Sequence, residues 1–424
     1  MIKKIIFSLL LFFGLAPILV NASTTLMAKV GDKYYDTLEE AIANASSDDV
    51  INLVSDVMLD ETITINKEVN INLNGNDISA KEKVFLVKGG FLDISGSGTI
   101  KETEPNYGAI MVIGSDTITD EKYSGVHVGK DVTLEGWSGI FINHENSKSY
   151  GVAVYLDGKI NAVNDTSGGT GIGVYVNGKI KDEENHPVVN ISDGAEIKST
   201  GNGLYISGSS TFYIGDAYIE GEESGIGIKS GTLNIDGATV VSNGEDETPT
   251  EGSNNGIKAS GTAIQIESNS SYAGKIQIDI SNGTFKSKNS HVIYEYIGKG
   301  NSSLIYSMSI SNGTFISEAG KDVFSLSDSF KDIHSGFISG GQYSSNPNEY
   351  LKSGYSAINE GGIYSVAKST LKGVNSSSVS GNSSSSFIKS LTWIVVLVIS
   401  GILVYFNRVK IIDLFYVLRD KFKK

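Results

Sequence analysis

The chain has 424 residues, a formal net charge of −14 and no cysteine. The lack of cysteine excludes disulfides, thiolate zinc sites and cysteine nucleophiles. Nine of the 34 basic residues, including both arginines, lie near the two ends of the chain, so the long middle part is strongly acidic and has no arginine. Such a surface disfavours nucleic acid and anionic polysaccharides, which are polyanions themselves, and we expect no nucleic-acid partner.

The first 22 residues have the pattern of a secretory signal. Lys3 and Lys4 precede an apolar run from residue 5 to residue 19. Small residues follow and end at Ala22, at the position where a signal peptidase cleaves. We therefore predict a signal peptide over residues 1–22, with the mature chain beginning near Ser23.

Residues 23–49 are predicted to form a strand and a short helix that caps the fold. Thr37 and Glu40 form the T-x-x-E pattern of a capping box, at which a helix begins. The next apolar residues fall at helical spacing. They are Leu38, Ala41, Ile42 and Ala45.

From residue 50 the apolar residues alternate with polar ones, which indicates strands with one buried face. Glycine is frequent, at 49 residues, and proline is rare, at 5 residues, as stacked strands require, because proline cannot donate to a strand ladder. Asn74-Gly75 is typical of a turn. The first residues expected to point inward are Ile51, Leu53, Ile63, Ile65, Val69, Ile71 and Leu73.

Repeated phrases indicate that these strands stack in coils. GVAVYLDGKI begins at Gly151 and the related GIGVYVNGKI begins at Gly171. The phrases ISNGTF, ISNGTF and ISGGQY begin at Ile280, Ile310 and Ile338. We predict an all-β fold, a parallel β-helix over residues 50–367, with about 22 residues per coil and about 11 to 14 coils. The three isoleucines are expected at one inward position of successive coils.

The C-terminal part is predicted to anchor the chain. Residues 245–255 are acidic and form a solvated loop, and residues 368–386 are rich in serine and form a tether. Residues 387–406 are apolar over a length that spans a bilayer. The basic residues 407–424 follow, which the positive-inside rule places in the cytoplasm. The sequence therefore predicts a single transmembrane helix, with the β-helix outside the cell.

The first and last segments of this region resemble a known family. VGDKYYDTLEEAI from Val30, together with DDVINLVSD and INLNG, resembles the first segment of pectate-lyase-like right-handed β-helices on surface proteins of Gram-positive and related bacteria. Residues 338–366 resemble the last coil and cap of such proteins. The resemblance implies a right-handed parallel β-helix and an adhesin-like surface protein. It does not specify a function, because this architecture includes enzymes, adhesins and stalks.

The patterns that would indicate catalysis are weak. The lyases of the resembled fold use an arginine base beside calcium-bound aspartates, and no arginine stands before Arg408. The related hydrolases use clustered aspartates and a Gly-His-Gly, but the only Asp-Asp pair is Asp48-Asp49 and no histidine has glycine on both sides. We predict no catalytic residues. A polysaccharide lyase or a glycoside hydrolase remains the alternative, because two carboxylates alone can support hydrolysis.

No cofactor is predicted, and calcium is the one cation that the sequence leaves open. Asp157-Gly158, Asp193-Gly194 and Asp236-Gly237 stand at strand ends, and carboxylates with turn carbonyls suit calcium. Asp-Gly is also an ordinary way to turn a strand, and no calcium-binding repeat is present. We therefore interpret these pairs as turns and predict no metal site.

Three tyrosines are the candidate binding residues. Tyr155 and Tyr175 occupy the same position in the two related phrases, so we expect them at equivalent outward places in adjacent coils, with Tyr205 near the same face. Outward tyrosine rings suit a sugar or a protein partner, or they shield the sheet as an aromatic ladder. We predict a membrane-anchored bacterial surface protein that binds a cell-surface glycan or protein, with a passive stalk as a further alternative.

Overall fold

The computed structural model describes residues 26–117, 123–181, 185–247, 261–272, 274–298 and 302–369. The expected signal peptide, transmembrane helix and basic tail, and nearly all of the tether, lie outside these residues, as does much of the expected acidic loop. Within the described ranges, no helix is both long enough and apolar enough to cross a membrane. The described residues form one compact unit.

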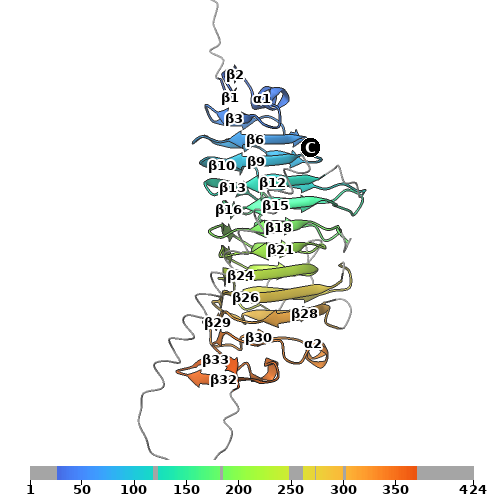
Figure 1. The fold of residues 1–424 in the computed structure, drawn as a ribbon, viewed down its shortest axis with the longest axis vertical. Helices are drawn as coiled ribbons and strands as arrows, with labels where there is room; N and C mark the ends of the chain where they lie inside the picture. Colours follow the sequence, from blue (N-terminus) through green and yellow to red (C-terminus); the bar gives the residue numbers. More distant parts are fainter. Residues whose placement is uncertain are drawn as a thin grey trace, which may run out of the picture. The chain divides into compact units, whose positions relative to one another are not determined.

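The described chain folds into stacked coils of parallel strands, as the alternation predicted (Figure 1). Each complete coil contributes three strands, and each strand pairs with its counterparts in the coils before and after it. We call the three resulting stacks the first, second and third series. The first series consists of β3 (Val50–Leu53), β6 (Glu68–Asn72), β9 (Phe91–Ser95), β12 (Ser124–Val128), β15 (Val152–Leu156), β18 (Val188–Ile191), β21 (Thr211–Ile214), β24 (Gly231–Ser242), β26 (Ile276–Ser287) and β28 (Ile305–Ile310).

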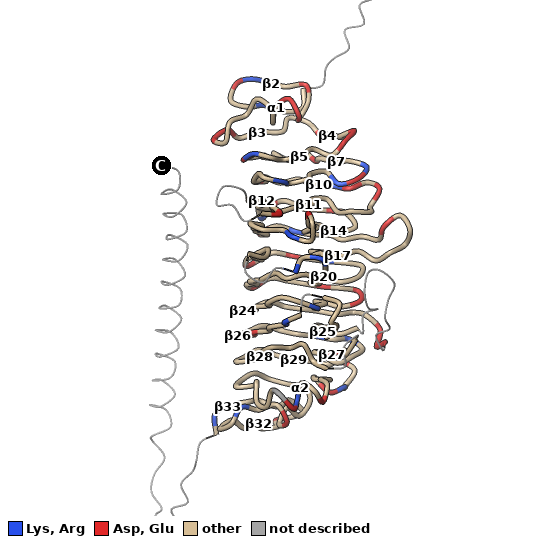
Figure 2. Tube along the Cα trace, turned by 90° about the vertical axis from the view of Figure 1, so that its right-hand side faces the viewer, with Lys and Arg blue, Asp and Glu red and all other residues tan. Residues whose placement is uncertain are grey.

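The second series joins the first in one 23-stranded sheet, because β24 and β26 each run through both series. The third series forms a separate 10-stranded sheet, several strands of which are labelled in Figure 2. The other second-series strands are β4 (Val57–Leu59), β7 (Ile78–Ala80), β10 (Gly98–Glu102), β13 (Val132–Gly136), β16 (Lys159–Ala162), β19 (Glu196–Ser199), β22 (Tyr218–Gly221), β29 (Thr314–Ser317) and β31 (Gln342–Tyr343). The third-series strands are β5 (Ile63–Ile65), β8 (Phe85–Val87), β11 (Ile110–Ile113), β14 (Ser138–Asn143), β17 (Ile172–Val176), β20 (Asn202–Ile206), β23 (Ser224–Ile228), β25 (Ile264–Ser268), β27 (Ile293–Ile297) and β30 (Phe324–Ser325).

Both ends of the stack carry caps. At the N-terminal end β1 (Ala28–Val30) pairs antiparallel with β2 (Lys33–Tyr35) and with β3. The predicted helix is α1 (Leu38–Asn44), and Thr37 Oγ1 accepts a hydrogen bond from the Glu40 N–H at 3.1 Å. The C-terminal end has α2 (Asp328–Ile333), the 3₁₀ turn η1 (Asn348–Tyr350) and the antiparallel pair β32 (Tyr355–Glu360) and β33 (Ile363–Lys368), none of which the sequence predicted individually.

The core consists of inward aliphatic columns with aromatic stacks beside them. All seven residues expected to point inward between positions 51 and 73 are buried. Ile280 pairs with Ile310 and Ile310 with Ile338, so the predicted column is confirmed. Phe285, Phe315 and Tyr343 stack in parallel at 4.8 and 5.0 Å between ring centroids. These columns bury apolar surface continuously between coils, and this burial is the main stabilisation of such a stack.

The number of coils lies at the lower end of the prediction. In the described residues the third series has ten strands and the second series has eleven, against the 11 to 14 coils expected. Some coils have the expected size, since Glu68 pairs with Phe91 and Thr211 with Thr232. Others contain long insertions, since Thr232 pairs with Gln277, 45 residues later. The number lies at the lower end of the range because inserted loops take up chain without adding a coil.

Candidate functional site

The structure separates the three tyrosines that the sequence grouped. Tyr155 lies in β15 of the first series and pairs with His127 and Asn190. Tyr175 lies in β17 of the third series and pairs with Tyr205. The expectation that Tyr155 and Tyr175 occupy equivalent places in adjacent coils is therefore wrong. The two phrases share a strand and a turn but stand at different corners of the coil, because the same local pattern suits both corners.

Tyr175 and Tyr205 belong to an aromatic cluster on the third series that is largely covered. The ring of Tyr175 stacks on Phe141 at 4.6 Å, and the Trp137 ring meets both edge-on. The exposed fraction is 8% for both Phe141 and Tyr205. Burial raises the pKa of the Tyr205 hydroxyl well above its ordinary value. This geometry agrees with the shielding role that the sequence left open for these two tyrosines.

Tyr155 belongs to a second and more open aromatic group on the first series. Its ring centroid lies 6.5 Å from that of Phe91, which lies 6.2 Å from that of Tyr123. Tyr155 and Phe91 are half-buried, and 52% of Tyr123 is exposed. Gly125 makes room for this group, because a Cβ there would lie 2.7 Å from the Phe91 ring. We call Phe91, Tyr123 and Tyr155 the aromatic patch.

A histidine held between two carboxylates lies in the same outward column as Tyr155. His127 Nδ1 lies 2.8 Å from Asp93 Oδ1, and its Nε2 lies 3.0 Å from Asp157 Oδ2. The hydrogen bonds that Asp157 and Asp93 accept raise the pKa of His127 to about 9, and the bond donated by His127 lowers the pKa of Asp157. The imidazole is therefore protonated at neutral pH and donates from both nitrogens. We call these three residues the histidine clamp.

The histidine clamp holds neighbouring strands together and prevents His127 from acting as a base. An imidazolium whose two N–H groups are both engaged has no lone pair with which to accept a proton. His127 therefore cannot act as a general base while both hydrogen bonds are present. The three side chains come from β9, from β12 and from the turn after β15, so the clamp also ties three successive coils together.

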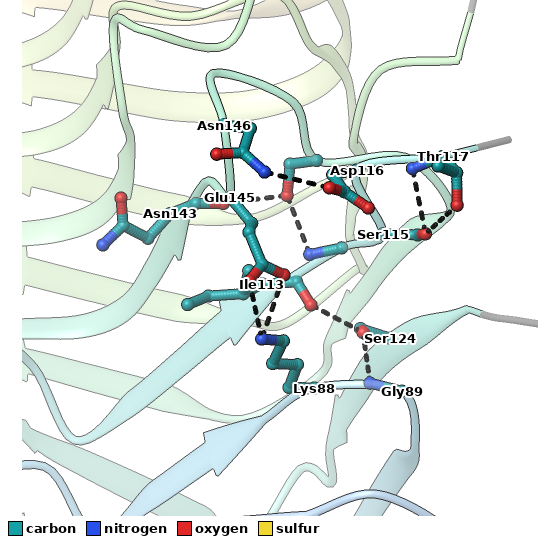
Figure 3. Close-up of polar contacts among 12 residues, drawn as sticks. Lys88, Gly89, Ile113, Ser115, Asp116, Thr117, Ser124, Asn143, Glu145 and Asn146 are labelled. Atoms are coloured by element: carbon teal, nitrogen blue, oxygen red, sulfur yellow. Dashed lines mark hydrogen bonds and ion pairs between the residues drawn. The ribbon is translucent and has the colours of Figure 1, made fainter.

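A polar cleft of about 330 Å³ lies where the chain passes from the third series to the first. Figure 3 shows its side chains converging from the ends of β8, β11 and β14. Lys88 Nζ forms an ion pair with Glu145 Oε2 at 2.9 Å. Asn146 Nδ2 donates to Asp116 Oδ2 at 2.9 Å, which joins the two loops that line the cleft. We call this hollow the corner cleft.

The corner cleft borders the aromatic patch. Ser124, the first residue of β12, follows Tyr123 in sequence, and its Oγ donates to the Ile113 carbonyl at 2.7 Å. The same Oγ accepts a hydrogen bond at 2.8 Å from the N–H of Gly89, two residues before Phe91. These bonds hold the chain where the cleft meets the patch. A polar hollow beside half-exposed aromatic rings offers both kinds of group that a small ligand can contact.

Of the three Asp-Gly pairs, Asp193-Gly194 lies in a turn, as interpreted from the sequence. Asp157-Gly158 directly follows β15, and Asp236-Gly237 lies at a register shift inside β24. The Asp193 and Asp236 carboxylates accept hydrogen bonds from the Asp216 N–H and the Ser281 hydroxyl, both at 2.9 Å. Gly194 and Gly237 have φ values of 87° and 113°, a conformation that glycine adopts at low cost. In the part of the chain that the structure describes, no group of three or more histidine, aspartate or glutamate side chains is placed to hold a metal ion.

Sequence reasoning missed the histidine clamp and the corner cleft. The partners of His127 are 34 and 30 residues away in the chain, so no short motif contains them. The available signal for Asp93 was the outward column that it shares with His127, which the alternation predicts once the coil lengths are known; Asp157 lies outside that column, in the turn after β15. Comparisons with protein-family models, with curated proteins and with solved structures gave no match.

Proposed function

We propose that this chain is a membrane-anchored bacterial cell-surface protein whose right-handed β-helix binds a glycan at the aromatic patch and the corner cleft. The observation that carries the proposal is the half-exposed patch of Phe91, Tyr123 and Tyr155 beside a polar hollow of about 330 Å³. Adhesion to a surface that carries this glycan is the function that follows. The alternatives that the experiments must distinguish from this proposal are binding of a protein ligand and a role as a passive stalk.

The chemistry of the site suits a neutral pyranose. The C–H face of a sugar ring packs on aromatic rings, and its hydroxyls need both donors and acceptors. Lys88 supplies a donor, and the carboxylates of Glu145 and Asp116 supply acceptors. The acidic charge of the middle part of the chain disfavours an anionic glycan, because like charges repel. The Lys88–Glu145 ion pair and the hydrogen bond from Asn146 to Asp116 hold these groups before binding, which lowers the entropic cost of association.

Binding without turnover is the better-supported reading. The histidine clamp uses both nitrogens of His127, and no arginine stands before Arg408. Release of product from a polysaccharide would instead favour the lyase or hydrolase alternative. Display at the cell surface is inferred from residues 1–22 and 387–406 and from the basic residues 407–424.

A glycan array with the full chain in detergent tests the binding site. The double substitution Phe91→Ala with Tyr155→Ala is expected to weaken binding at least about tenfold, as truncation of an aromatic anchor does. Tyr213→Ala is the matched control, because Tyr213 is 52% exposed in the same outward column, two coils further along. Equal losses in both variants, or no binding by the wild-type chain, would contradict the proposal.

Protease treatment of intact cells tests the display. We expect release of a soluble fragment that contains the stacked coils and ends between residues 368 and 386. If the coils are cleaved from the membrane only after permeabilisation, the proposed orientation is wrong. This result does not depend on the ligand, so it separates the location of the protein from its binding activity.

A further inference from the structure

A lysine, a glutamate and an asparagine meet in a buried site on the third series. Lys229 directly follows β23, and Glu267 lies in β25 of the next coil, where Ile228 pairs with Ile266. Their exposed fractions are 3% and 2%. Lys229 Nζ lies 2.5 Å from Glu267 Oε2, which has no aligned hydrogen bond among the described residues. Oε2 is therefore held by the charge of the lysine.

The second oxygen of the same carboxylate contacts an asparagine amide. Asn269 Nδ2 donates to Glu267 Oε1 at 2.7 Å, and Asn269 is 9% exposed. Asn269 Oδ1 accepts a hydrogen bond from the Ser271 N–H at 3.0 Å. This donor polarises the side-chain carbonyl and would stabilise negative charge on its oxygen. One carboxylate thus lies between an amine and a polarised amide.

Aromatic rings enclose the amine. Lys229 Nζ lies 4.9 Å from the ring centroid of Tyr205 and 4.8 Å from that of Tyr272. Burial lowers the pKa of Lys229, although the nearby Glu267 charge opposes that effect. A desolvated lysine beside a proton acceptor is the usual form of an activated amine nucleophile.

We propose that Lys229 and Asn269 become joined by an intramolecular amide bond, with Glu267 transferring the protons. Glu267 takes a proton from the Lys229 ammonium, and the freed lone pair on Nζ attacks Cγ of Asn269. The carbonyl electron pair moves to Oδ1, beside the Ser271 N–H. Glu267 gives its proton to Nδ2 and takes the second proton from Nζ. The Cγ–Nδ2 bond then breaks, the carbonyl re-forms and ammonia leaves, so atoms and charge balance without an oxidant or a co-reactant.

The bond would link two successive coils covalently. The chain has no cysteine, so a disulfide is not available for this purpose. An amide cross-link closes the chain between residues 229 and 269 and restricts the unfolded state in the way a disulfide does. It is also insensitive to reducing agents, because no sulfur takes part.

Peptide mass spectrometry of the purified full chain tests the proposal directly. Trypsin does not cleave after an acylated lysine, so residues 199–258 are expected as one peptide, joined to residues 259–275. The mass of the joined species should be lower than the sum of the two peptides by one ammonia. Recovery of an unmodified peptide that ends at Lys229, with no joined species, would overturn the proposal. This measurement needs no variant and does not depend on the proposed glycan site.

Variants assign the roles of the residues. Asn269→Ala and Glu267→Gln are each expected to give the uncrosslinked peptides. Asn177→Ala is the matched control and should keep the cross-link, because the Asn177 amide donates to Asn143 instead of to a carboxylate. A joined peptide that persists in Asn269→Ala would show that Asn269 is not the acyl donor. Thermal unfolding under reducing conditions should give a higher midpoint for the cross-linked wild type than for Asn269→Ala.

Discussion

The first and third series both carry outward aromatic rings, and the most exposed of these rings lie on the first series. On the third series Phe141 and Tyr205 are each 8% exposed, and Trp137 donates from Nε1 to the Thr170 carbonyl of a covering loop at 2.9 Å. On the first series Tyr123 is 52% exposed. The rings themselves are similar, so the difference comes from the loops that the coils insert. A strand phrase alone therefore does not show whether its outward residues stabilise the fold or can meet a ligand.

Both faces pack on the same core, and a charge placed in that core should cause the largest loss of folding stability. Ile310 is fully buried in the column between Ile280 and Ile338, whereas Ser311 is exposed. A carboxylate buried without a partner costs several kcal/mol. Ile310→Asp should abolish cooperative unfolding in a urea titration followed by circular dichroism, and Ser311→Asp should leave the midpoint unchanged. Equal effects would show that the inward register is wrong.

Truncating one ring on each face should separate the two roles. Phe141→Ala removes a ring that stacks on Tyr175 and meets Trp137, and we expect it to lower the free energy of unfolding by about 3 kcal/mol. Tyr155→Ala on the open face should lower it by less than about 1 kcal/mol, because that ring has fewer partners. Urea denaturation of both variants gives the comparison. A larger loss for Tyr155→Ala would reverse the assignment of covered and open faces.

A buried carboxylate holds the backbone next to the aromatic cluster of the third series. Glu102 is 1% exposed and accepts hydrogen bonds from the N–H groups of Asn106, Tyr107, Gly108 and Trp137 at 2.9 to 3.1 Å. Glu102→Gln replaces one acceptor oxygen with a donor that faces other donors. We expect a loss of about 2 kcal/mol and a more accessible Trp137, measured by denaturation and by quenching of tryptophan fluorescence. Glu104→Gln, a substitution at an exposed site in the same loop, serves as the control.

Removal of the histidine clamp on the first series should cause the smallest change in folding stability, and that change should depend on pH. The folded-state pKa of His127 is about 9, above its ordinary value of 6.5. The stabilisation is therefore complete below about pH 6.5 and is lost as the pH rises through about 9. Relative to His127→Asn, the wild type should gain about 1 kcal/mol near pH 6 and nothing near pH 10, since partial exposure weakens the pair. An advantage that grows with pH would contradict the clamp.

The sequence predicted the features that depend on local patterns. The inward residues from Ile51 to Leu73, the helix after Thr37 and the column through Ile310 all follow from spacing along the chain. It could not predict which strands become neighbours, because inserted loops change the coil length. Tyr155 was therefore paired with the wrong residue, and the contact of Lys229 with Glu267 was not foreseen.

The antiparallel caps have a consequence for assembly. A stack of parallel strands has two open ends, and each end offers unpaired backbone groups to the matching end of another copy. Here β1 pairs antiparallel with β3 at one end, and β33 pairs antiparallel with β31 and β32 at the other. A second copy cannot continue the parallel ladder across these strands. End-to-end growth by parallel pairing is thus blocked for the first series at the N-terminal end and for the second series at the C-terminal end.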